Sequence, residues 1–141
     1  KVKATVPQLC NIKTGDFGEI NFGEYLGVAK TITVNTVFDC KANTNITFSI
    51  ENGANPNSTA EARRLPLAGT PGDVEKYLSY QITSDSAGTK IIGTGSQAYK
   101  EKLSASASRL VVYYYGQLSA TQPNAIIGEY FEDLNATIDY E

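Results

Sequence analysis

The sequence predicts an all-β fold, an antiparallel β-sandwich, and three observations lead to this prediction. Short segments in which apolar and polar residues alternate recur along the chain, and turn-forming Gly, Asn, Asp and Pro separate them. No segment has a convincing apolar period of about 3.6 residues, as an amphipathic helix would. At 141 residues the chain fits one domain, residues 1–141, that buries roughly two-thirds of its unfolded surface. We therefore expect roughly seven or more strands in two packed layers.

The first part of the chain contains a series of predicted strands. Residues 4–12 form the first, although Pro7 has no amide hydrogen and interrupts its ladder. Residues 19–22 form a short one. Residues 30–40 form the clearest early strand, because one face carries Ile32, Val34, Thr36, Phe38 and Cys40. Residues 45–51 follow, with inward-facing Ile46, Phe48 and Ile50.

The middle of the chain is less regular. Residues 58–72 are expected to be irregular around Arg63 and Arg64, for which a salt bridge at the rim of the sandwich is the preferred interpretation. Residues 76–83 form a strand whose apolar face carries Leu78, Tyr80 and Ile82. Residues 91–92 begin a short strand. Residues 103–118 contain the longest β-favouring run, and large groups on both of its faces predict a central strand.

The last predicted strand, residues 128–140, is the segment on which the functional interpretation depends. Its apolar residues alternate with polar ones and share one face, which carries Leu134, Ala136, Ile138 and Tyr140. Strand and sequence end together, so we expect no later strand of this chain to pair with its outer edge. If the strand lies at a sheet edge, its unpaired backbone groups need a partner from another chain or a shield against unwanted pairing.

Composition argues against several classes of function. Lys and Arg number 12 against 15 Asp and Glu, and no basic block is present that would bind a row of phosphates. No apolar run approaches the roughly 18 residues of a membrane helix. Without any His, neither a Ser-His-Asp nor a Cys-His arrangement can be built. We expect no nucleic-acid binding, no membrane insertion, no catalytic residue, no cofactor and no metal site.

Acidic residues are the remaining candidates for chemistry. Glu129, Glu132 and Asp133 cluster ahead of the last predicted strand, and a glycosidase needs only two carboxyl groups. A solvated loop is the preferred interpretation of this cluster. Other acidic residues lie in Gly-containing turns, where Asp is expected for turn chemistry rather than for calcium binding.

The two cysteines, Cys10 and Cys40, allow two interpretations. They form a disulfide in an exported protein, which we favour, or stay as reduced core thiols in a cytosolic one. A disulfide closing a loop of this length stabilises the fold by roughly 3 to 4 kcal/mol in the chain-entropy model. Two cysteines without any His do not complete the four ligands of a structural zinc site.

The order of these features resembles the spore coat protein U domain family, which includes subunits of archaic chaperone-usher pili. The resemblance runs from about residue 5 to residue 140. It rests on Cys10 followed by Asn21-Phe22-Gly23-Glu24-Tyr25, the strand closing at Cys40, Arg63-Arg64, Leu78-Ser79-Tyr80-Gln81-Ile82 and Val112-Tyr113-Tyr114-Tyr115-Gly116-Gln117-Leu118. Its most specific part is the C-terminal stretch of the sequence, which contains Gly128-Glu129-Tyr130 and then Asn135-Ala136-Thr137-Ile138-Asp139-Tyr140.

This resemblance implies an incomplete immunoglobulin-like sandwich that lacks its final strand and carries a disulfide between Cys10 and Cys40. A periplasmic chaperone supplies the missing strand, and in the fibre the N-terminal segment of a neighbouring subunit replaces it. The implied partners are that chaperone, an outer-membrane usher and further subunits of a homopolymer, and the implied location is the periplasm and then the cell surface. The implied function is a pilus subunit that supports adhesion and biofilm formation.

Within this picture we predict a donor-strand groove. Its wall carries Leu134, Ala136, Ile138 and Tyr140, and Val111 and Tyr113, or else Val112 and Tyr114, line the core beneath it. The alternating Val2, Ala4 and Val6, within residues 1–9, are the candidate donor segment. This segment is shorter than the family's, so it is short by nature, has been trimmed, or belongs to a subunit that need not donate.

Rival functions stay open beside the shaft subunit. An adhesive tip domain requires exposed apolar loops, and the loops at 52–58 and 119–124 are mainly polar, which disfavours it. An envelope or spore coat protein that is stable as a monomer, or a carbohydrate-binding sandwich, would not need a donor strand.

Overall fold

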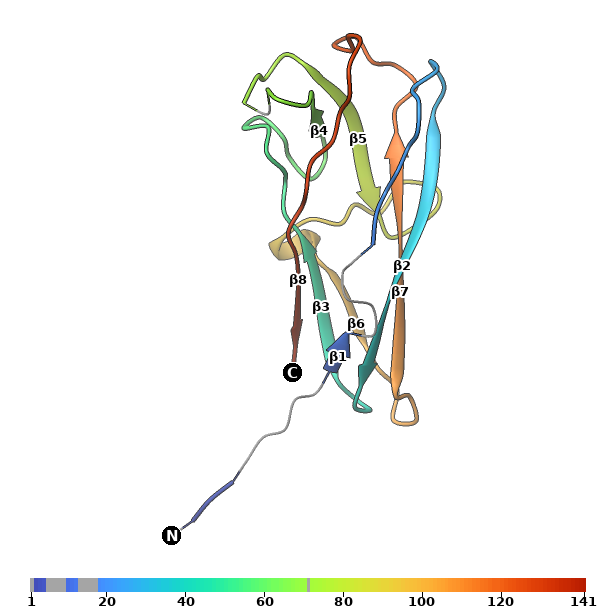
Figure 1. Ribbon diagram of the computed structural model, residues 1–141. Coiled ribbons are helices and arrows are strands. Elements are labelled where there is room, and N and C mark those ends of the chain that lie inside the picture. The colour runs from blue at the N-terminus through green and yellow to red at the C-terminus, as the bar shows by residue number, and fades with distance from the viewer. Residues whose placement is uncertain (1, 5–9, 13–17, 71) are drawn as a thin grey trace.

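The fold is a two-layer antiparallel β-sandwich (Figure 1). The computed structural model describes residues 2–4, 10–12, 18–70 and 72–141. One sheet has five strands in the order β1-β2-β7-β5-β4, and the other has three in the order β6-β3-β8. The elements are β1 Cys10–Ile12, β2 Lys30–Cys40, β3 Asn45–Ile50, β4 Arg63–Pro66, β5 Tyr77–Thr83, η1 Gly95–Gln97, β6 Tyr99–Lys102, β7 Arg109–Leu118 and β8 Ala136–Tyr140. The predicted all-β sandwich is confirmed.

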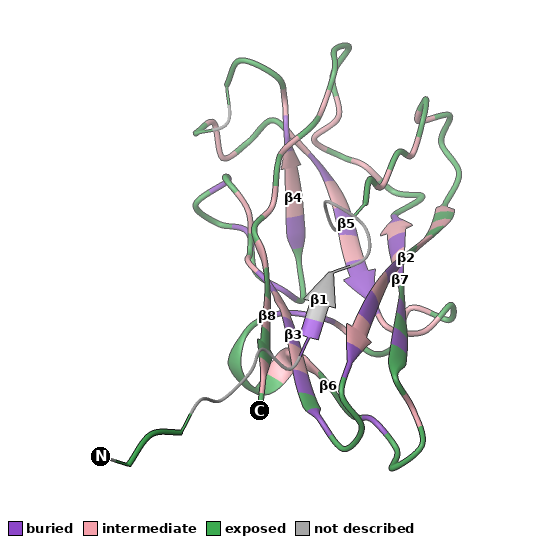
Figure 2. Cartoon of the chain, turned by 60° about the horizontal axis from the view of Figure 1, so that its bottom comes forward, coloured by how far each residue is buried: buried purple, intermediate pink, exposed green. Residues whose placement is uncertain are grey.

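The long pair β2 and β7 forms the centre of the larger sheet. Its register runs from Lys30 opposite Leu118 to Asp39 opposite Arg109. β7 lies between β2 and β5, so the prediction of a central strand is confirmed. Buried residues alternate along it with exposed or intermediate ones (Figure 2), and the inward face consists of Leu110, Val112, Tyr114, Gly116 and Leu118.

Three of the predicted strands agree closely with observed ones. β2 coincides with the predicted 30–40, while β3 and β5 differ from the predictions by one residue. Their predicted inward residues on β3 and β5 are all buried, with exposed fractions of 8% or less. Tilted at 37°, the Phe48 ring of β3 packs on the Tyr114 ring of β7 at a centroid distance of 5.8 Å, which joins the two layers.

Other segments depart from the prediction. Residues 19–22 form no strand; they lie across the inner face of β7 instead, where Ile20 and Phe22 pack on the core. Their place depends on Gly116, because a Cβ atom there would lie 2.5 Å from Cγ2 of Ile20. β4 lies within a segment expected to be irregular, and β6 was not predicted at all.

The only helical element among the described residues is the short η1, so this part of the chain contains no helix long and apolar enough to cross a membrane. The core is one cluster that includes residues from both sheets. Cys10 and Cys40 are joined by a disulfide with a Cα–Cα distance of 4.1 Å, and they face each other in the register of β1 and β2. The predicted disulfide is confirmed.

Candidate functional site

The candidate site is the edge of β8 that faces away from β3, hereafter the open edge. Within the described residues β8 pairs with β3 alone, with Ile138 opposite Phe48. Next to the strand, Asn45 and Glu141 exchange two backbone hydrogen bonds of 2.9 and 3.1 Å. Because such pairs alternate along an antiparallel ladder, residues 137 and 139 also point their backbone groups at β3. The N–H and C=O groups of residues 136, 138 and 140 therefore point out from the open edge.

The apolar side chains of β8 face the interior but are only half-buried. On the neighbouring β3, Ile46 and Phe48 are 1% and 0% exposed. Their partners in the register, Tyr140 and Ile138, pack against the core but are intermediate in exposure. The same holds for Leu134 and Ala136. An interior face that stays partly exposed, next to an unpaired backbone edge, is suited to receiving another strand.

The structure corrects one part of the predicted groove. Val111 and Tyr113 are 36% and 52% exposed, on the outer face of β7, and do not line the core. Val112 and Tyr114, the alternative pair, are buried at 1% and 4%. The pairing of β7 with β2 and the contact of Tyr114 with Phe48 fix this orientation. Because both faces of the run carry large groups, alternation alone did not decide it.

The two arginines of the sequence pattern occupy different environments. Arg63 is fully buried instead of lying at the rim, so the expected rim salt bridge is wrong for it. Its guanidinium donates to the carbonyl oxygens of Ile50, Glu51 and Ile92. Burial lowers the pKa of Arg63, and nearby Tyr80, Glu132 and Glu51 partly offset that effect. Arg64 points elsewhere, over the Tyr77 ring at 4.4 Å.

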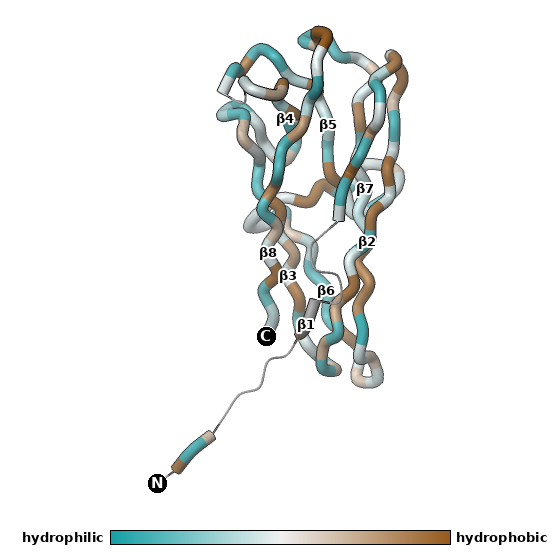
Figure 3. Tube along the Cα trace, in the orientation of Figure 1, coloured by the Kyte–Doolittle hydropathy of each residue, from teal (hydrophilic) through white to brown (hydrophobic). Residues whose placement is uncertain are grey.

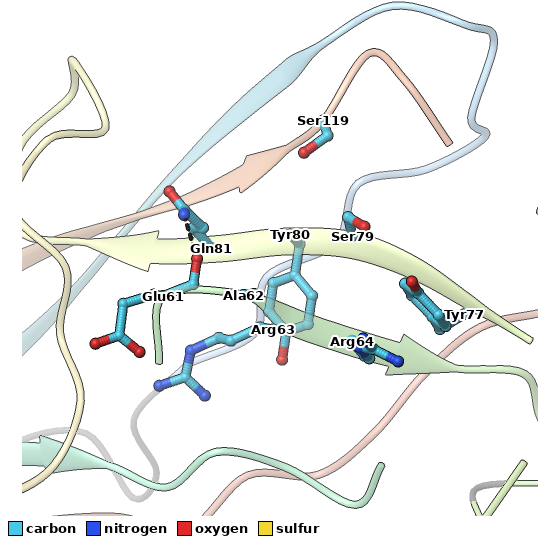
Figure 4. A pocket seen from close by; sticks show the side chains of 9 residues that line it. All are labelled: Glu61, Ala62, Arg63, Arg64, Tyr77, Ser79, Tyr80, Gln81 and Ser119. Carbon is cyan, nitrogen blue, oxygen red and sulfur yellow. Dashed lines mark hydrogen bonds between the residues drawn. The ribbon is translucent and has the colours of Figure 1, made fainter. Parts of the chain in front are cut away.

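A small pocket lies beside β4 and β5 (Figure 4). Its lining comprises Glu61, Ala62, Arg63, Arg64, Tyr77, Ser79, Tyr80, Gln81 and Ser119. Figure 4 shows the side chains of Arg63 and Tyr80 projecting together from neighbouring strands, in agreement with their pairing in the register. Among the described residues, no three His, Cys, Asp or Glu side chains are grouped so that they could hold a metal ion.

The three residues of the acidic cluster differ in their burial and in their contacts. Glu132 is half-buried, and its carboxylate accepts hydrogen bonds from the Tyr80 hydroxyl at 2.5 Å and the Ala54 N–H at 2.8 Å. The side chains of Glu129 and Asp133 are exposed, as expected of a solvated loop. These contacts of Glu132 could not be predicted from the sequence, because they join residues that are far apart in the chain.

A comparison with family models gives a match to the Spore Coat Protein U domain over residues 1–137. The chain belongs to this family. The comparison with curated proteins gives no match.

Solved structures with the same fold as this Spore Coat Protein U domain include pilus subunits. One is the pre-assembly complex of chaperone CsuC with tip adhesion subunit CsuE, from archaic chaperone-usher Csu pili of Acinetobacter baumannii. The TM-score is 0.64 at 16% sequence identity, and the match covers 92% of this chain and 39% of the matched chain. The P pilus rod subunit PapA gives 0.64 at 14% identity, covering 95% of this chain and 100% of that one. A chaperone-usher pilus structure concerned with rod uncoiling gives 0.57 at 12%, covering 100% and 93%. These likenesses establish the fold.

The candidate donor segment of the Spore Coat Protein U domain stays a prediction. Val2 and Ala4 are exposed, and Val2 is 101% exposed, so neither packs on the sandwich. Val6 lies outside the described residues.

Proposed function

We propose that the chain is a structural, non-enzymatic subunit of a bacterial surface pilus that a chaperone-usher system assembles by donor-strand exchange. The observation that carries the proposal is the open edge of β8, with its outward backbone groups and half-buried apolar face. Membership of the Spore Coat Protein U domain family and the fold shared with pilus subunits support it.

Strand addition is the mechanism that this edge supports. A donor strand lies along β8 and bonds to the free backbone groups of residues 136, 138 and 140. Its alternate apolar side chains cover Leu134, Ile138 and Tyr140, which completes the burial that the chain alone leaves unfinished. Fully burying one large aliphatic side chain contributes about 1.5 to 3 kcal/mol relative to leaving it exposed.

The donor changes during the life of the subunit. A periplasmic chaperone donates first and keeps the open edge from aggregating. At the outer-membrane usher the N-terminal segment of a neighbouring subunit replaces the chaperone strand, and the polymer grows at the cell surface. The fibre then supports adhesion and biofilm formation.

The test is size-exclusion chromatography with mass analysis of the purified chain, alone and after co-expression with the chaperone of its own assembly system. The proposal expects a one-to-one complex, or polymers that resist SDS at room temperature. A lone monomer that is equally stable with and without the chaperone would reject the proposal, and the coat or glycan-binding alternatives would replace it.

A tip adhesion subunit is the second candidate, because one end of the sandwich exposes several large apolar side chains. Five large apolar residues in two loops are at least half exposed, with fractions between 50% and 103%: Leu26, Val28, Ile126, Ile127 and Phe131. Both loops include apolar stretches at the end of the sandwich far from the C-terminus (Figure 3). These residues lie outside the polar loops 52–58 and 119–124 that the sequence suggested.

Adsorption to polystyrene beads separates the two subunit roles. For a tip subunit, Ile127→Ser with Phe131→Ser lowers adsorption of the chaperone-bound chain, while the exposed polar control Thr121→Ser has no effect. Equal adsorption of all three proteins rejects the tip role and leaves the shaft role.

A further inference from the structure

A buried polar cluster joins the five-stranded sheet to the end of β3. Arg63 on β4 has no exposed surface, yet it donates to Ile50 O at 3.3 Å and Ile92 O at 3.0 Å. It also donates to Glu51 O. Ile50 is the last residue of β3 and lies opposite Ala136, the first residue of β8. The guanidinium therefore fixes the point at which the pairing of β3 with β8 begins.

Glu132 extends the cluster to the segment that leads into β8. Tyr80, the partner of Arg63 in the register of β4 and β5, donates its hydroxyl to Oε1 of Glu132 at 2.5 Å. The Ala54 N–H donates to Oε2 at 2.8 Å. A Cβ atom at Gly53 would lie 2.6 Å from Oε2, so the carboxylate packs directly against this residue, whose φ of +115° favours Gly. One carboxylate thus connects the segment that leads into β8 to β5 and to the loop that follows β3.

Glu51 holds the residue just before β8. Its carboxylate accepts hydrogen bonds from the N–H of Asn135 at 2.9 Å and from Asn135 Nδ2 at 3.3 Å. Its own N–H donates to Asn135 O at 3.1 Å. Carboxylate hydrogen bonds therefore hold residues 132 and 135, which lie just ahead of β8, a strand that has one neighbour among the described residues.

The charges of the cluster are complementary. Arginine side chains stay protonated in proteins, so Arg63 carries a positive charge. Glu132 and Glu51 are close enough to interact with this charge favourably. Burial, and then the charge of Glu132, raises the pKa of the Tyr80 hydroxyl, so that it remains a donor. Charge-assisted hydrogen bonds of this kind are about twice as strong as neutral ones.

We propose that Arg63, Tyr80 and Glu132 are positioning residues that fix the start of β8, so that the open edge is formed before a donor strand arrives. This inference rests on the proposed function. An edge strand with one partner is weakly held by its ladder alone, and ordering it during binding would reduce the affinity for the donor. With the cluster in place, β8 is ordered when the subunit folds and not when the donor binds. Arg63 thus has a role in the interior of the fold.

Hydrogen–deuterium exchange of the full chain, with its disulfide intact, tests the hold on β8 without any donor. The variants Tyr80→Phe and Glu132→Gln each remove a contact of the cluster while keeping the size of the side chain. Tyr25→Phe is the matched control, since its hydroxyl donates a single hydrogen bond of 2.6 Å to Ala120 O in another loop. In both cluster variants, the β8 amides that face β3 should exchange at least about tenfold faster, while those of β2 and β7 keep their rates.

The second measurement is the association rate of a synthetic peptide in which valine and threonine alternate between flanking lysines. Tyr80→Phe and Glu132→Gln should slow it several-fold, and Tyr25→Phe should not. An equal rise of exchange in all strands, unchanged exchange in β8, or an unchanged association rate each overturns the inference. If the wild-type chain captures neither this peptide nor the chaperone, the proposed function fails. The exchange experiment uses no donor, so it tests the hold on β8 independently of that result.

Discussion

The Asp85 carboxylate organises the turn at residues 84–90. It accepts hydrogen bonds from the hydroxyl of Thr89, the N–H of Lys90 at 2.7 Å and the N–H of Thr89 at 3.0 Å. These donors, Thr89 foremost, hold the pKa of Asp85 below its ordinary value of 3.8. With a depressed folded pKa, its stabilisation is complete above the unfolded value and is lost as pH falls through the folded one.

We therefore expect the amide resonances of Thr89 and Lys90 to be constant from neutral pH to about pH 4 and to move at lower pH, when followed by NMR. Asp85→Asn is the control and should remove this movement. A midpoint above the ordinary pKa of a free Asp would contradict the assigned hydrogen bonds.

The disulfide gives a second prediction at the scale of residues. Cys10 and Cys40 are separated by 30 positions, and the bond fixes the short β1 to β2. Replacing both cysteines with Ser should lower the free energy of unfolding by roughly 3 to 4 kcal/mol, measured by urea denaturation. Dithiothreitol should destabilise the native chain equally and leave the double variant unchanged. If the native chain and the double variant unfolded at the same urea concentration, the disulfide would add no stability.

Single residues were the level at which sequence reasoning was weakest. The sequence indicates that Leu110 to Tyr115 is a strand, but with large groups on both faces it cannot tell Val111 from Val112 as the buried one. The burial of Arg63 was equally hidden, because its three carbonyl partners are brought together by the fold alone.

Strands were predictable where apolar and polar residues alternate over a long segment and the apolar residues share one face. β2, β3 and β5 were found this way. β6 was missed because its sequence, Tyr-Lys-Glu-Lys, has charges on both faces, which is typical of a protected edge. The last strand was predicted over 128–140, but β8 itself covers Ala136–Tyr140. Upstream, a bridge from Tyr130 to Leu67 and the contacts of Glu132 replace the ladder.

β8 allows a test in which one charge is placed on either face. Ile138 faces the interior and is half-buried, whereas its neighbour Thr137 is exposed. Ile138→Asp puts a carboxylate against the apolar surface that a donor strand must cover, at a cost of at least about 2 kcal/mol. Donor affinity should then fall by more than about tenfold, measured by titration with the alternating peptide.

Thr137→Asp adds the same charge on the other face and should leave donor affinity within about twofold, since surface substitutions usually change little. Circular dichroism shows whether both variants remain folded. Equal affinities for the two variants would place the donor somewhere other than the open edge.

At the scale of the molecule, the two sheets are completed to different degrees. In the larger sheet, β2 and β7 are paired along ten positions and shield much of the core. In the smaller sheet, β3 is fully buried on its inner face, while β8 beside it is not. Burial is therefore unfinished on one side of the sandwich, and anything that completes it binds the folded state selectively. Such binding raises the stability of the fold by mass action.

This linkage predicts that the melting temperature depends on the concentration of the donor. At a free donor concentration of 100 times its Kd, the folded state gains about 2.7 kcal/mol, which corresponds to a rise on the order of 10 °C for a domain of this size. Thermal unfolding followed by circular dichroism across a titration with the alternating peptide measures the rise. Ile138→Asp is the control and should show little of it, because its open edge binds the same peptide weakly. A wild-type melting temperature that stays constant over the whole titration would mean that the sandwich is already complete, and that the half-burial of β8 is a stable property of the fold instead of a site awaiting a strand.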